Sequence, residues 1–553
     1  MFKNCLTSLS LSILLMIVSM PILSAVTTLI QSNDQLQTAS SKSETAIPAD
    51  IEAIMNKPMY KNAQWGLRVL NLETGQELLN LNSDTHFFIG SVRKIFSIGE
   101  LLNKVGPNYY SVTTVHKDGV IQNGTLNGNL VLVASGDLTM GGRTLPNGKI
   151  AFTPFDHNEA DSLGNAILTQ TNPLAGYQNL AKQIKKLGIH AITGDVIIDD
   201  RLFDAFNFRN QFDVSPIFVN DDVVDVIIKP GKVNEKSVVD WSPKSAAFSV
   251  INELVTAQPN KKYTLELHPV LPKCIGNPNC LGIIKGDLPI NFSPPLTNSY
   301  PLIQTYRITK PANFARTVFI EALQQAGVDV SKITKVKDNP VNLLKPSPFY
   351  NEENQITTLK SLPYQEHAKF ILKVSYNIGA DTSLMLLGLT NGERTMAGSL
   401  AMEKKELQNK YGIASSEYHF IDGSGGGDTT ATNKIITKWL AIMSKETSFD
   451  AFFNALPILA HDGSLDFVTN FKSNPTLSGA AGHVYAKPGT YVIGGESGMI
   501  LKGQALAGYI HSKNNHKLIF NLVVNNIPIN SLDNLLEVFQ DQGTIAALLW
   551  RDQ

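Results

Sequence analysis

In the first part of the chain, apolar residues recur first at the spacing of a helix and then alternate with polar residues as in a strand. Ile51–Met55 has the spacing of a short helix. Trp65–Leu72 and Glu77–Leu81 have the pattern of strands, and the turn residues between them predict a hairpin. From Ser91 onward the apolar residues recur at helical spacing until the glycine–proline pair at 106–107, so a second helix is expected there.

The C-terminal third begins with helical patterns and ends with strands. The predicted strands are His483–Lys487, Gln504–Ile510 and Lys517–Val524. A last helix is expected from Leu532, with apolar residues on one face. The two ends of the chain therefore predict a domain of mixed helices and strands, of the α/β (α+β) class.

The segment between these ends has a different pattern. Residues 121–355 consist largely of short alternating runs separated by turns, without a repeat period. Examples are Gly128–Val133, Gly194–Ile198 and Val223–Ile228. The simplest organisation is one discontinuous domain, residues 46–120 and 356–553, that is interrupted by one or two β-rich domains at 121–355.

The first 25 residues have the pattern of a secretory signal peptide. Lys3 precedes an apolar stretch, Leu11–Leu23, which ends at the small residues Ser24 and Ala25. A membrane anchor is the alternative, but it needs about 20 apolar residues and this stretch is shorter and interrupted. We expect cleavage near Ala25, export to the periplasm, and a polar tether at residues 26–45.

Composition narrows the class of protein without indicating its chemistry. The 553 residues exceed one ordinary hydrophobic core, and 43% apolar with 17% charged residues is typical of a soluble globular protein. Lys and Arg number 47 against 48 Asp and Glu, so no basic excess is present to bind a nucleic acid. Nucleic-acid binding is therefore not expected as the main function.

Cysteine is scarce, and its spacing suggests one structural link. Loss of the signal peptide removes Cys5 and leaves Cys274 and Cys280 around a five-residue loop. In an oxidising compartment a short disulfide between them is plausible, as a clamp on a loop. A metal site is not expected, because no second cysteine or histidine pair lies nearby at the spacing of zinc ligands.

Ser91 and Lys94 form an S-x-x-K motif at the start of a predicted helix. Residues three apart share a helix face, so the lysine amine can reach the serine hydroxyl. A hydroxyl is a poor nucleophile unless an adjacent base takes its proton, and a desolvated lysine can be that base. The alternative is an ordinary helix-capping serine with a surface lysine one turn later.

Two further motifs are weaker when each is taken alone. Ser375 and Asn377 form S-x-N, in which a loop can direct a hydroxyl and an amide into one cleft, but residues 512–514 repeat the pattern. Lys487 supplies a cation for a carboxylate, and Gly489 lets a substrate backbone approach the strand. The same Lys-Pro-Gly tripeptide recurs at residues 229–231.

The order and setting of the three motifs resemble those of the serine penicillin-recognising enzymes, whose motifs are S-x-x-K, S-x-N and K-T-G. The long insertion narrows the resemblance to the class C low-molecular-mass penicillin-binding proteins, the D-alanyl-D-alanine carboxypeptidase/endopeptidase family. Further similar stretches are Leu130–Asp137, Gly194–Asp199, Asp422–Gly425, Leu456–Pro457 and Asp462–Ser464. The resemblance implies a penicillin-binding/β-lactamase-like transpeptidase domain, with helices around an antiparallel sheet and β-rich inserted domains.

The resemblance also implies a role for each motif residue. Ser91 is expected to be the acyl-accepting nucleophile and Lys94 its general base. Ser375 is expected to relay a proton to the leaving amine, and Asn377 to bind the peptide amide of the substrate. Water then releases the acyl-enzyme, so neither a cofactor nor a metal is expected.

On the strand, Lys487 and Thr490 are expected to recognise the substrate carboxylate, and the amides of Ser91 and Thr490 to form the oxyanion hole. Pro488 departs from the family pattern, because the hydroxyl of a threonine or serine is missing there. An edge strand tolerates proline. We therefore predict altered carboxylate recognition rather than loss of acylation.

The expected partners are peptidoglycan stem peptides or cross-links, with β-lactams as inhibitors. One alternative in the same class is a β-lactamase-like hydrolase. Another is a catalytically weakened or inactive homologue that binds peptidoglycan or a protein partner. Any association with a membrane is expected to be peripheral at most, and no oligomeric state is predicted.

Overall fold

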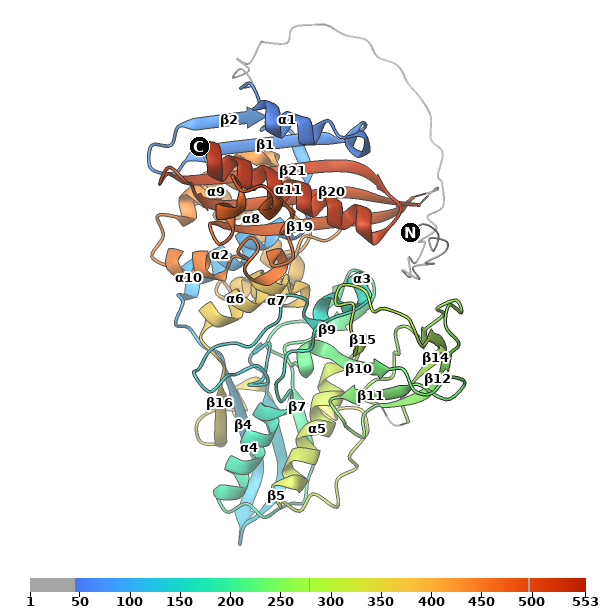
Figure 1. The fold of residues 1–553 in the computed structure, drawn as a ribbon. Coiled ribbons are helices and arrows are strands. Elements are labelled where there is room, and N and C mark those ends of the chain that lie inside the picture. Colours follow the sequence, from blue (N-terminus) through green and yellow to red (C-terminus); the bar gives the residue numbers. More distant parts are fainter. Residues whose placement is uncertain (1–44, 278, 496–497) are drawn as a thin grey trace, which may run out of the picture.

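The computed structural model describes residues 45–277, 279–495 and 498–553. The expected signal peptide, residues 1–25, and nearly all of the expected tether, residues 26–45, lie outside the described residues. Figure 1 shows two bodies, a core domain formed by the two ends of the chain and an insert formed by the middle. None of the helices in the described ranges has the length and apolar character needed to span a bilayer.

The core domain is built on a five-stranded antiparallel sheet in the order β19-β20-β21-β1-β2. Its strands are β1 (Gln64–Asn71), β2 (Glu77–Leu81), β19 (Val484–Gly495), β20 (Gly498–His511) and β21 (Lys517–Ile529). The N-terminal hairpin completes the C-terminal sheet by pairing β1 with β21 along its whole length. The three C-terminal strands extend beyond their predicted bounds, because the pairing includes flanking glycine and polar residues.

Alternate residues of β21 point to opposite faces of the sheet, as the two-residue period requires. Ile519 and Val523 pack against one group of helices, and Leu518 and Leu522 against the other. The first group is α2 (Lys94–Val105), α6 (Tyr364–Val374), α7 (Asn377–Leu389), α8 (Met396–Asn409), α9 (Asn433–Met443) and α10 (Phe449–Ala455). The second is α1 (Ala49–Met55) and α11 (Leu532–Asp552). The expected arrangement of helices around an antiparallel sheet is confirmed.

A small three-stranded sheet lies beside the main one and ends close to the S-x-x-K motif. It consists of β3 (His86–Phe88), β18 (Thr430–Thr432) and β17 (Tyr418–His419). The strand β3 leads directly into the turn that carries Ser91. Pairing of β3 with β18 therefore joins the start of the motif helix to the later part of the core domain.

The insert has its own hydrophobic core and combines strands with helices. Its strands are β4 (Val112–Gln122), β5 (Thr125–Val133), β6 (Ala191–Ile192), β7 (Val196–Asp199), β8 (Phe206–Phe208), β9 (Phe212–Val214), β10 (Val223–Lys229), β11 (Val238–Ser242), β12 (Ser249–Ala257), β13 (Glu266–His268), β14 (Leu281–Pro289), β15 (Leu302–Arg307) and β16 (Gln355–Lys360). Its longer helices are α4 (Ala175–Lys186) and α5 (Pro311–Gln325), and α3 (Ala160–Leu163) is a single turn. The alternating pattern predicted the strands, whereas α4 and α5 were not anticipated.

The pairing of strands bears on where the insert begins and ends. The boundaries expected at 120/121 and 355/356 cut through β4 and β16, which pair with each other in the sheet β16-β4-β5-β6. The two passages of the chain are joined where the amide of Ser361 donates to the carbonyl of Ser111 at 3.0 Å. We propose that the insert extends from about this pair of residues, because a strand belongs to the sheet in which it pairs.

Aromatic side chains of the insert contribute to the core domain. Phe203, Phe206, Phe212 and Phe218 join the hydrophobic cluster formed by α2, α6 and α7. Burial of large aromatic surface dominates such contacts. The insert therefore packs against the helices that carry the S-x-x-K and S-x-N motifs.

The two remaining cysteines lie in the insert, where Cys274 and Cys280 form a disulfide with an S–S distance of 2.07 Å. Cys280 is buried in the hydrophobic core of the insert, and Cys274 packs against that core. The link closes a loop between β13 and β14. The disulfide is expected to affect stability rather than catalysis, because the loop packs on the core of the insert and not on the core domain that carries the three motifs.

We expect the double variant Cys274→Ser/Cys280→Ser to lose about 2 kcal/mol of unfolding free energy, the chain-entropy value for so small a ring. Urea unfolding of the full chain measures the loss. Wild-type protein treated with a thiol reductant is the matched control, because it should unfold like the variant. Equal stability of the variant and the oxidised wild type would contradict this role.

Candidate active site

Ser91 lies in the turn that opens the first long helix of the core domain. One 3-10 turn, Gly90–Arg93, runs directly into α2, so Lys94 begins the helix one turn after Ser91. Gly90 has a left-handed φ of 47°, and a Cβ atom there would lie 2.7 Å from the amide nitrogen of Thr490. Glycine thus allows the Ser91 turn to pack directly against β19.

The amine of Lys94 is fully buried and surrounded by oxygen atoms. Its Nζ donates to Ser91 Oγ at 2.6 Å, to Asn377 Oδ1 at 2.7 Å and to the carbonyl of Ser424 at 2.9 Å. A buried amine must be hydrogen-bonded to offset its loss of water. These acceptors hold the amine beside the hydroxyl, which is the contact that the S-x-x-K spacing predicted.

The S-x-N motif joins two helices that pack behind the Ser91 turn. Ser375 ends α6 in a left-handed conformation with φ 63°, and Asn377 begins α7. The sharp change of direction brings the Ser375 hydroxyl 3.5 Å from Lys94 Nζ and 2.9 Å from Lys487 Nζ. Ser375 therefore lies between the two lysines.

Lys487 lies on β19, the edge strand of the main sheet. Its side chain is fully buried, and its Nζ also donates to the carbonyl of Pro488 at 2.9 Å. The amide of Ala486 donates outward to the carbonyl of Pro457 rather than to β20. Because residues two apart on a strand point the same way, positions 488 and 490 also face the outer edge. Proline at 488 therefore removes an outward-facing N–H and leaves the pairing with β20 intact.

Two residues of this strand that are expected to bind substrate also make close contacts within the protein. A Cβ atom on Gly489 would clash with the carbonyl of Ile89 and lie 2.9 Å from the amide of Ser91. Gly489 therefore admits the turn of Ser91 itself, a close approach that the sequence did not predict. The hydroxyl of Thr490 donates to Gln504 Oε1 at 2.7 Å, so in this conformation its proton is engaged within the protein.

A glycine-rich loop that the motif search left without a role completes the site. Asp422 Oδ1 accepts the amides of Ser424, Gly425 and Gly426 at 2.6–3.1 Å, which folds the loop around one carboxylate. The loop then presents the carbonyl of Ser424 to Lys94. The repeated glycines were a signal in the sequence that this loop is tightly folded. The residue that the loop contacts, Lys94, lies 330 residues earlier in the chain, so the sequence pattern did not reveal the contact.

Beneath this loop lies Asp381, a fully buried carboxyl group on α7. Burial, and then the negative charge of Asp422, raise the pKa of Asp381 to about 8. Its Oδ1 accepts the amide of Gly423 at 2.9 Å. At neutral pH the group is therefore mostly a neutral acid, so it supplies little negative charge to Lys94 nearby.

The insert also reaches the rim of the site. Arg209, in the hairpin formed by β8 and β9, donates to Ser424 Oγ at 3.1 Å while its guanidinium lies over the ring of Phe208. The side chain is largely exposed to solvent. Sequence reasoning missed this cation because only the fold brings it beside the glycine-rich loop.

The repeated copies of the weaker motifs lie elsewhere. Residues 512–514 form the turn between β20 and β21, and Lys229 ends β10 of the insert with its side chain exposed. Unlike these copies, the arrangement near Ser91 combines a hydroxyl with two buried amines. Such a site suits acyl transfer to a serine, with lysine as the proton acceptor. Together the fold and this site define a serine hydrolase of the penicillin-binding class.

Comparison with known proteins gives the family. The model of the D-Ala-D-Ala carboxypeptidase 3 (S13) family matches residues 47–540. The chain belongs to this family of serine-type D-Ala-D-Ala carboxypeptidases.

Two characterised relatives carry the same activity in their names. The D-alanyl-D-alanine carboxypeptidase DacB of Haemophilus influenzae is 21% identical over 501 residues, which cover 87% of this chain and 89% of the relative. The D-alanyl-D-alanine carboxypeptidase of Actinomadura sp. is 22% identical over 320 residues, 55% of this chain. That match spans only 51% of the Actinomadura protein.

The fold is also that of a solved penicillin-binding protein. The crystal structure of penicillin binding protein 4 (dacB) from Haemophilus influenzae superposes with a TM-score of 0.66 at 16% identity, covering 91% of this chain and 100% of that one. A second structure of the same protein, complexed with a β-lactam, has a TM-score of 0.63. At this identity the likeness concerns the fold, and it includes the insert.

We expect Asp381→Asn to flatten the pH dependence of stability. The pKa of this carboxyl is raised in the folded chain above its ordinary 3.8, so folding takes up a proton and stability falls as pH rises from about 4 to about 8. Removing the group should change the slope by up to about 1.4 kcal/mol per pH unit in that range. Urea unfolding at pH 5, 6, 7 and 8 measures it.

The control for this experiment is Asp84→Asn, a carboxylate whose side chain is 78% exposed. Its profile should run parallel to that of the wild type. If the Asp381→Asn profile also runs parallel, the carboxyl is ionised in the folded protein and the interpretation is wrong.

Proposed function

We propose that this chain is an exported, periplasmic D-Ala-D-Ala carboxypeptidase/endopeptidase that hydrolyses peptidoglycan stem peptides or cross-links through an acyl-enzyme on Ser91. The observation that carries the proposal is the contact between the buried amine of Lys94 and Ser91 Oγ at 2.6 Å. The same amine is held by Asn377 and by the glycine-rich loop. The family supports the reaction class.

In the acylation step Lys94 acts in its neutral form. Its two hydrogens stay on Asn377 Oδ1 and the Ser424 carbonyl, and its lone pair takes the proton of the Ser91 hydroxyl as Oγ attacks the substrate carbonyl. The Oγ–C bond forms first, and the bond from carbon to the leaving nitrogen then breaks. The amides of Ser91 and Thr490 donate to the oxyanion, since Thr490 N–H faces the outer edge of β19. An oxyanion donor of this kind lowers the barrier by about 2.7–4 kcal/mol.

The leaving amine needs a proton, and Ser375 lies where it can supply one. Its hydroxyl contacts Lys487 Nζ at 2.9 Å and Lys94 Nζ at 3.5 Å, so a proton can pass from Lys94 to the hydroxyl and on to the amine. Lys487 adds a fixed positive charge for the carboxylate of the substrate. The stem peptide would pair with the open edge of β19 by main-chain hydrogen bonds.

Deacylation needs only water and the same lysine. Lys94 takes a proton from water, the hydroxide oxygen bonds to the acyl carbon, and the Ser91 Oγ–C bond breaks with return of the proton to Ser91. β-Lactams would acylate Ser91 by opening their ring, since their amide imitates the peptide. The steps call on no cofactor.

We expect wild-type protein to form a stoichiometric adduct with penicillin, detected by mass spectrometry of the intact chain and located at Ser91 by peptide mapping. Ser91→Ala should form none, because the attacking oxygen is absent. Ser512→Ala, in the repeated copy of S-x-N, is the matched control and should react like the wild type.

Absence of an adduct on the wild type under saturating drug would contradict the proposal and favour an inactive, peptidoglycan-binding homologue. An adduct that is lost within seconds as hydrolysed drug would favour the β-lactamase-like alternative. Release of D-alanine from a D-Ala-D-Ala peptide, and cleavage of a cross-linked dimer, separate the carboxypeptidase and endopeptidase activities.

We expect Pro488→Thr to lower the KM for a D-Ala-D-Ala peptide about fivefold, with a smaller change in kcat. A new hydroxyl on the outer edge of β19 adds one hydrogen bond to the substrate carboxylate, worth about 1 kcal/mol. Pro488→Ala removes the ring without adding a hydroxyl and is the control. Equal KM values for the threonine and alanine variants would show that the missing hydroxyl does not limit carboxylate recognition.

A further inference from the structure

The insert contacts the S-x-N motif through the helix that leads into it. Glu366, near the start of α6, accepts the amide of Ile150 from the insert at 3.0 Å. One turn later, the ring of Phe370 lies 4.2 Å beneath the guanidinium of Arg143. The residue between the two motif positions, Tyr376, donates its hydroxyl to the carbonyl of Asp221 at 3.3 Å. The insert thus contacts the motif at its middle residue.

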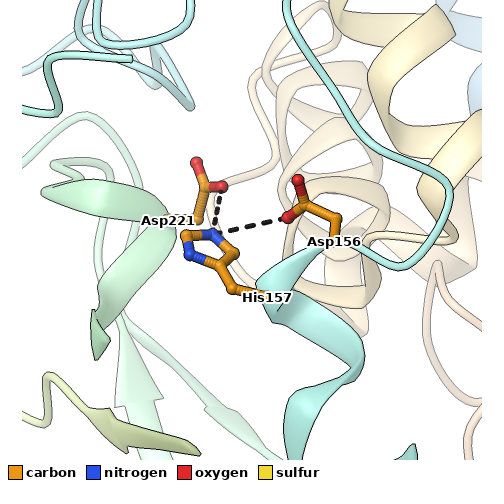
Figure 2. A group of neighbouring side chains, drawn as sticks. All are labelled: Asp156, His157 and Asp221. Atoms are coloured by element: carbon orange, nitrogen blue, oxygen red, sulfur yellow. Dashed lines mark hydrogen bonds and ion pairs between the residues drawn. The ribbon is translucent and has the colours of Figure 1, made fainter. Parts of the chain in front are cut away.

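Arg143 and Asp221 belong to a buried charge cluster within the insert. Figure 2 shows three of its side chains, Asp156, His157 and Asp221, with the imidazole next to both carboxylates. The guanidinium of Arg143 donates to both oxygens of Asp156, at 2.8 and 2.9 Å, and through Nε to Asp221 Oδ2 at 2.8 Å. All of these side chains are fully buried or nearly so.

His157 connects the two sides of this cluster. Its Nε2 lies 2.8 Å from Asp221 Oδ2 and its Nδ1 2.8 Å from Asp225 Oδ1. Although burial opposes the charged form, the nearby carboxylates, Asp225 foremost, raise the pKa of His157 to about 10. Two cations therefore face three carboxylates, and each ring nitrogen donates to one of them.

The spacing of Asp156, His157 and Asp221 also fits a metal site, since their ligand atoms lie within 4.8 Å of one another. However, Asp221 Oδ2 already accepts from Arg143 and His157, and both oxygens of Asp156 accept from Arg143. A metal would have to displace a guanidinium that is itself 95% buried. Arg143 occupies the position of the cation, so the group is a closed ion cluster.

The cluster fixes a backbone conformation that is otherwise unfavourable. Asn220, Asp221 and Asp222 are consecutive residues with φ values of 51°, 54° and 61°. Left-handed residues without glycine are strained and persist only where their surroundings hold them. The side chain of Asp221 is anchored by Arg143 and His157, and this directs its carbonyl toward Tyr376.

The donor of that hydrogen bond, Tyr376, directly follows a second left-handed residue. Ser375 has a left-handed φ of 63°, and the following side chain, Tyr376, is 1% exposed and packs 5.3 Å from Phe370 between ring centroids. The tyrosine is therefore held by its ring on one side and by its hydroxyl on the other. Its backbone neighbours are Ser375 and Asn377, which contact Lys487 and Lys94.

We propose that the buried cluster of Arg143, Asp156, His157 and Asp221 is a positioning device, through which the insert holds Ser375 and Asn377 against the two lysines by way of Tyr376. This inference rests on the proposed function. The cluster residues lie outside the three motifs and reach them through Tyr376, so they are positioning residues and not catalytic ones. The insert is accordingly part of the scaffold of the active site.

The test compares Tyr376→Phe with the wild type in stopped-flow acylation by a fluorescent penicillin, using the full chain. Loss of the hydroxyl should lower the first-order acylation rate about three- to tenfold, the effect of one buried hydrogen bond, while the drug concentration for half-maximal rate changes less. His157→Gln should lower the rate in the same range. The double variant should be no slower than the slower single variant, because both act through Asp221.

Tyr306→Phe is the matched control. That tyrosine is equally buried and also donates to a backbone carbonyl, of Ile283 at 2.9 Å, but within the far part of the insert. It should acylate like the wild type even if its melting temperature falls. If Tyr376→Phe and Tyr306→Phe lower the melting temperature alike and leave acylation unchanged, the cluster is merely structural and the inference is wrong.

Three further outcomes would also overturn the inference. Stoichiometric zinc or another divalent metal in purified protein, lost in Asp156→Asn, would show that the group is a metal site rather than a closed ion cluster. A wild-type chain that no penicillin acylates would overturn the proposed function, and with it the positioning role. Normal acylation of the wild type together with unchanged rates in both variants would overturn the positioning role alone.

Discussion

Burial of two lysine amines is the constraint on which the rest of this structure depends. Neither the side chain of Lys94 nor that of Lys487 is exposed, and an amine loses its hydration when it is buried. The structure offsets this cost with oxygen atoms from the Ser91 turn, the S-x-N loop, the glycine-rich loop and β19 itself. Each of these segments must therefore be placed accurately, and most of the fold serves that placement.

Close approach of backbones is how the core domain achieves this. Gly90 and Gly489 let the Ser91 turn and β19 touch without side chains between them, and Gly425 packs against the same turn from another side. Because β19 is an edge strand, its inner amides bind β20 while its outer positions are left for other partners: the amide of Ala486 binds Pro457, and Thr490 faces the outer edge beside the Ser91 turn. The same geometry explains why Pro488 is tolerated.

The insert extends this placement beyond the core domain. Its aromatic residues enter the hydrophobic cluster around α2, α6 and α7, and its ion cluster meets Tyr376 inside the S-x-N motif. A module of the chain that carries none of the three motifs thereby contacts two elements that do. Arg209 adds a cation at the rim, beside the glycine-rich loop.

The sequence by itself determined the local elements and the motif chemistry. Period-two and helical patterns predicted β1, β2 and the α2 helix closely, and i,i+3 spacing predicted that Lys94 reaches Ser91, because these depend on neighbours in the chain. Only the tertiary structure decided that Gly489 admits the Ser91 turn, that Asp381 is held as a neutral acid, and that Tyr376 meets Asp221. These depend on burial and on contacts between segments more than a hundred residues apart for Gly489 and Tyr376, and about forty for Asp381, which no local pattern records.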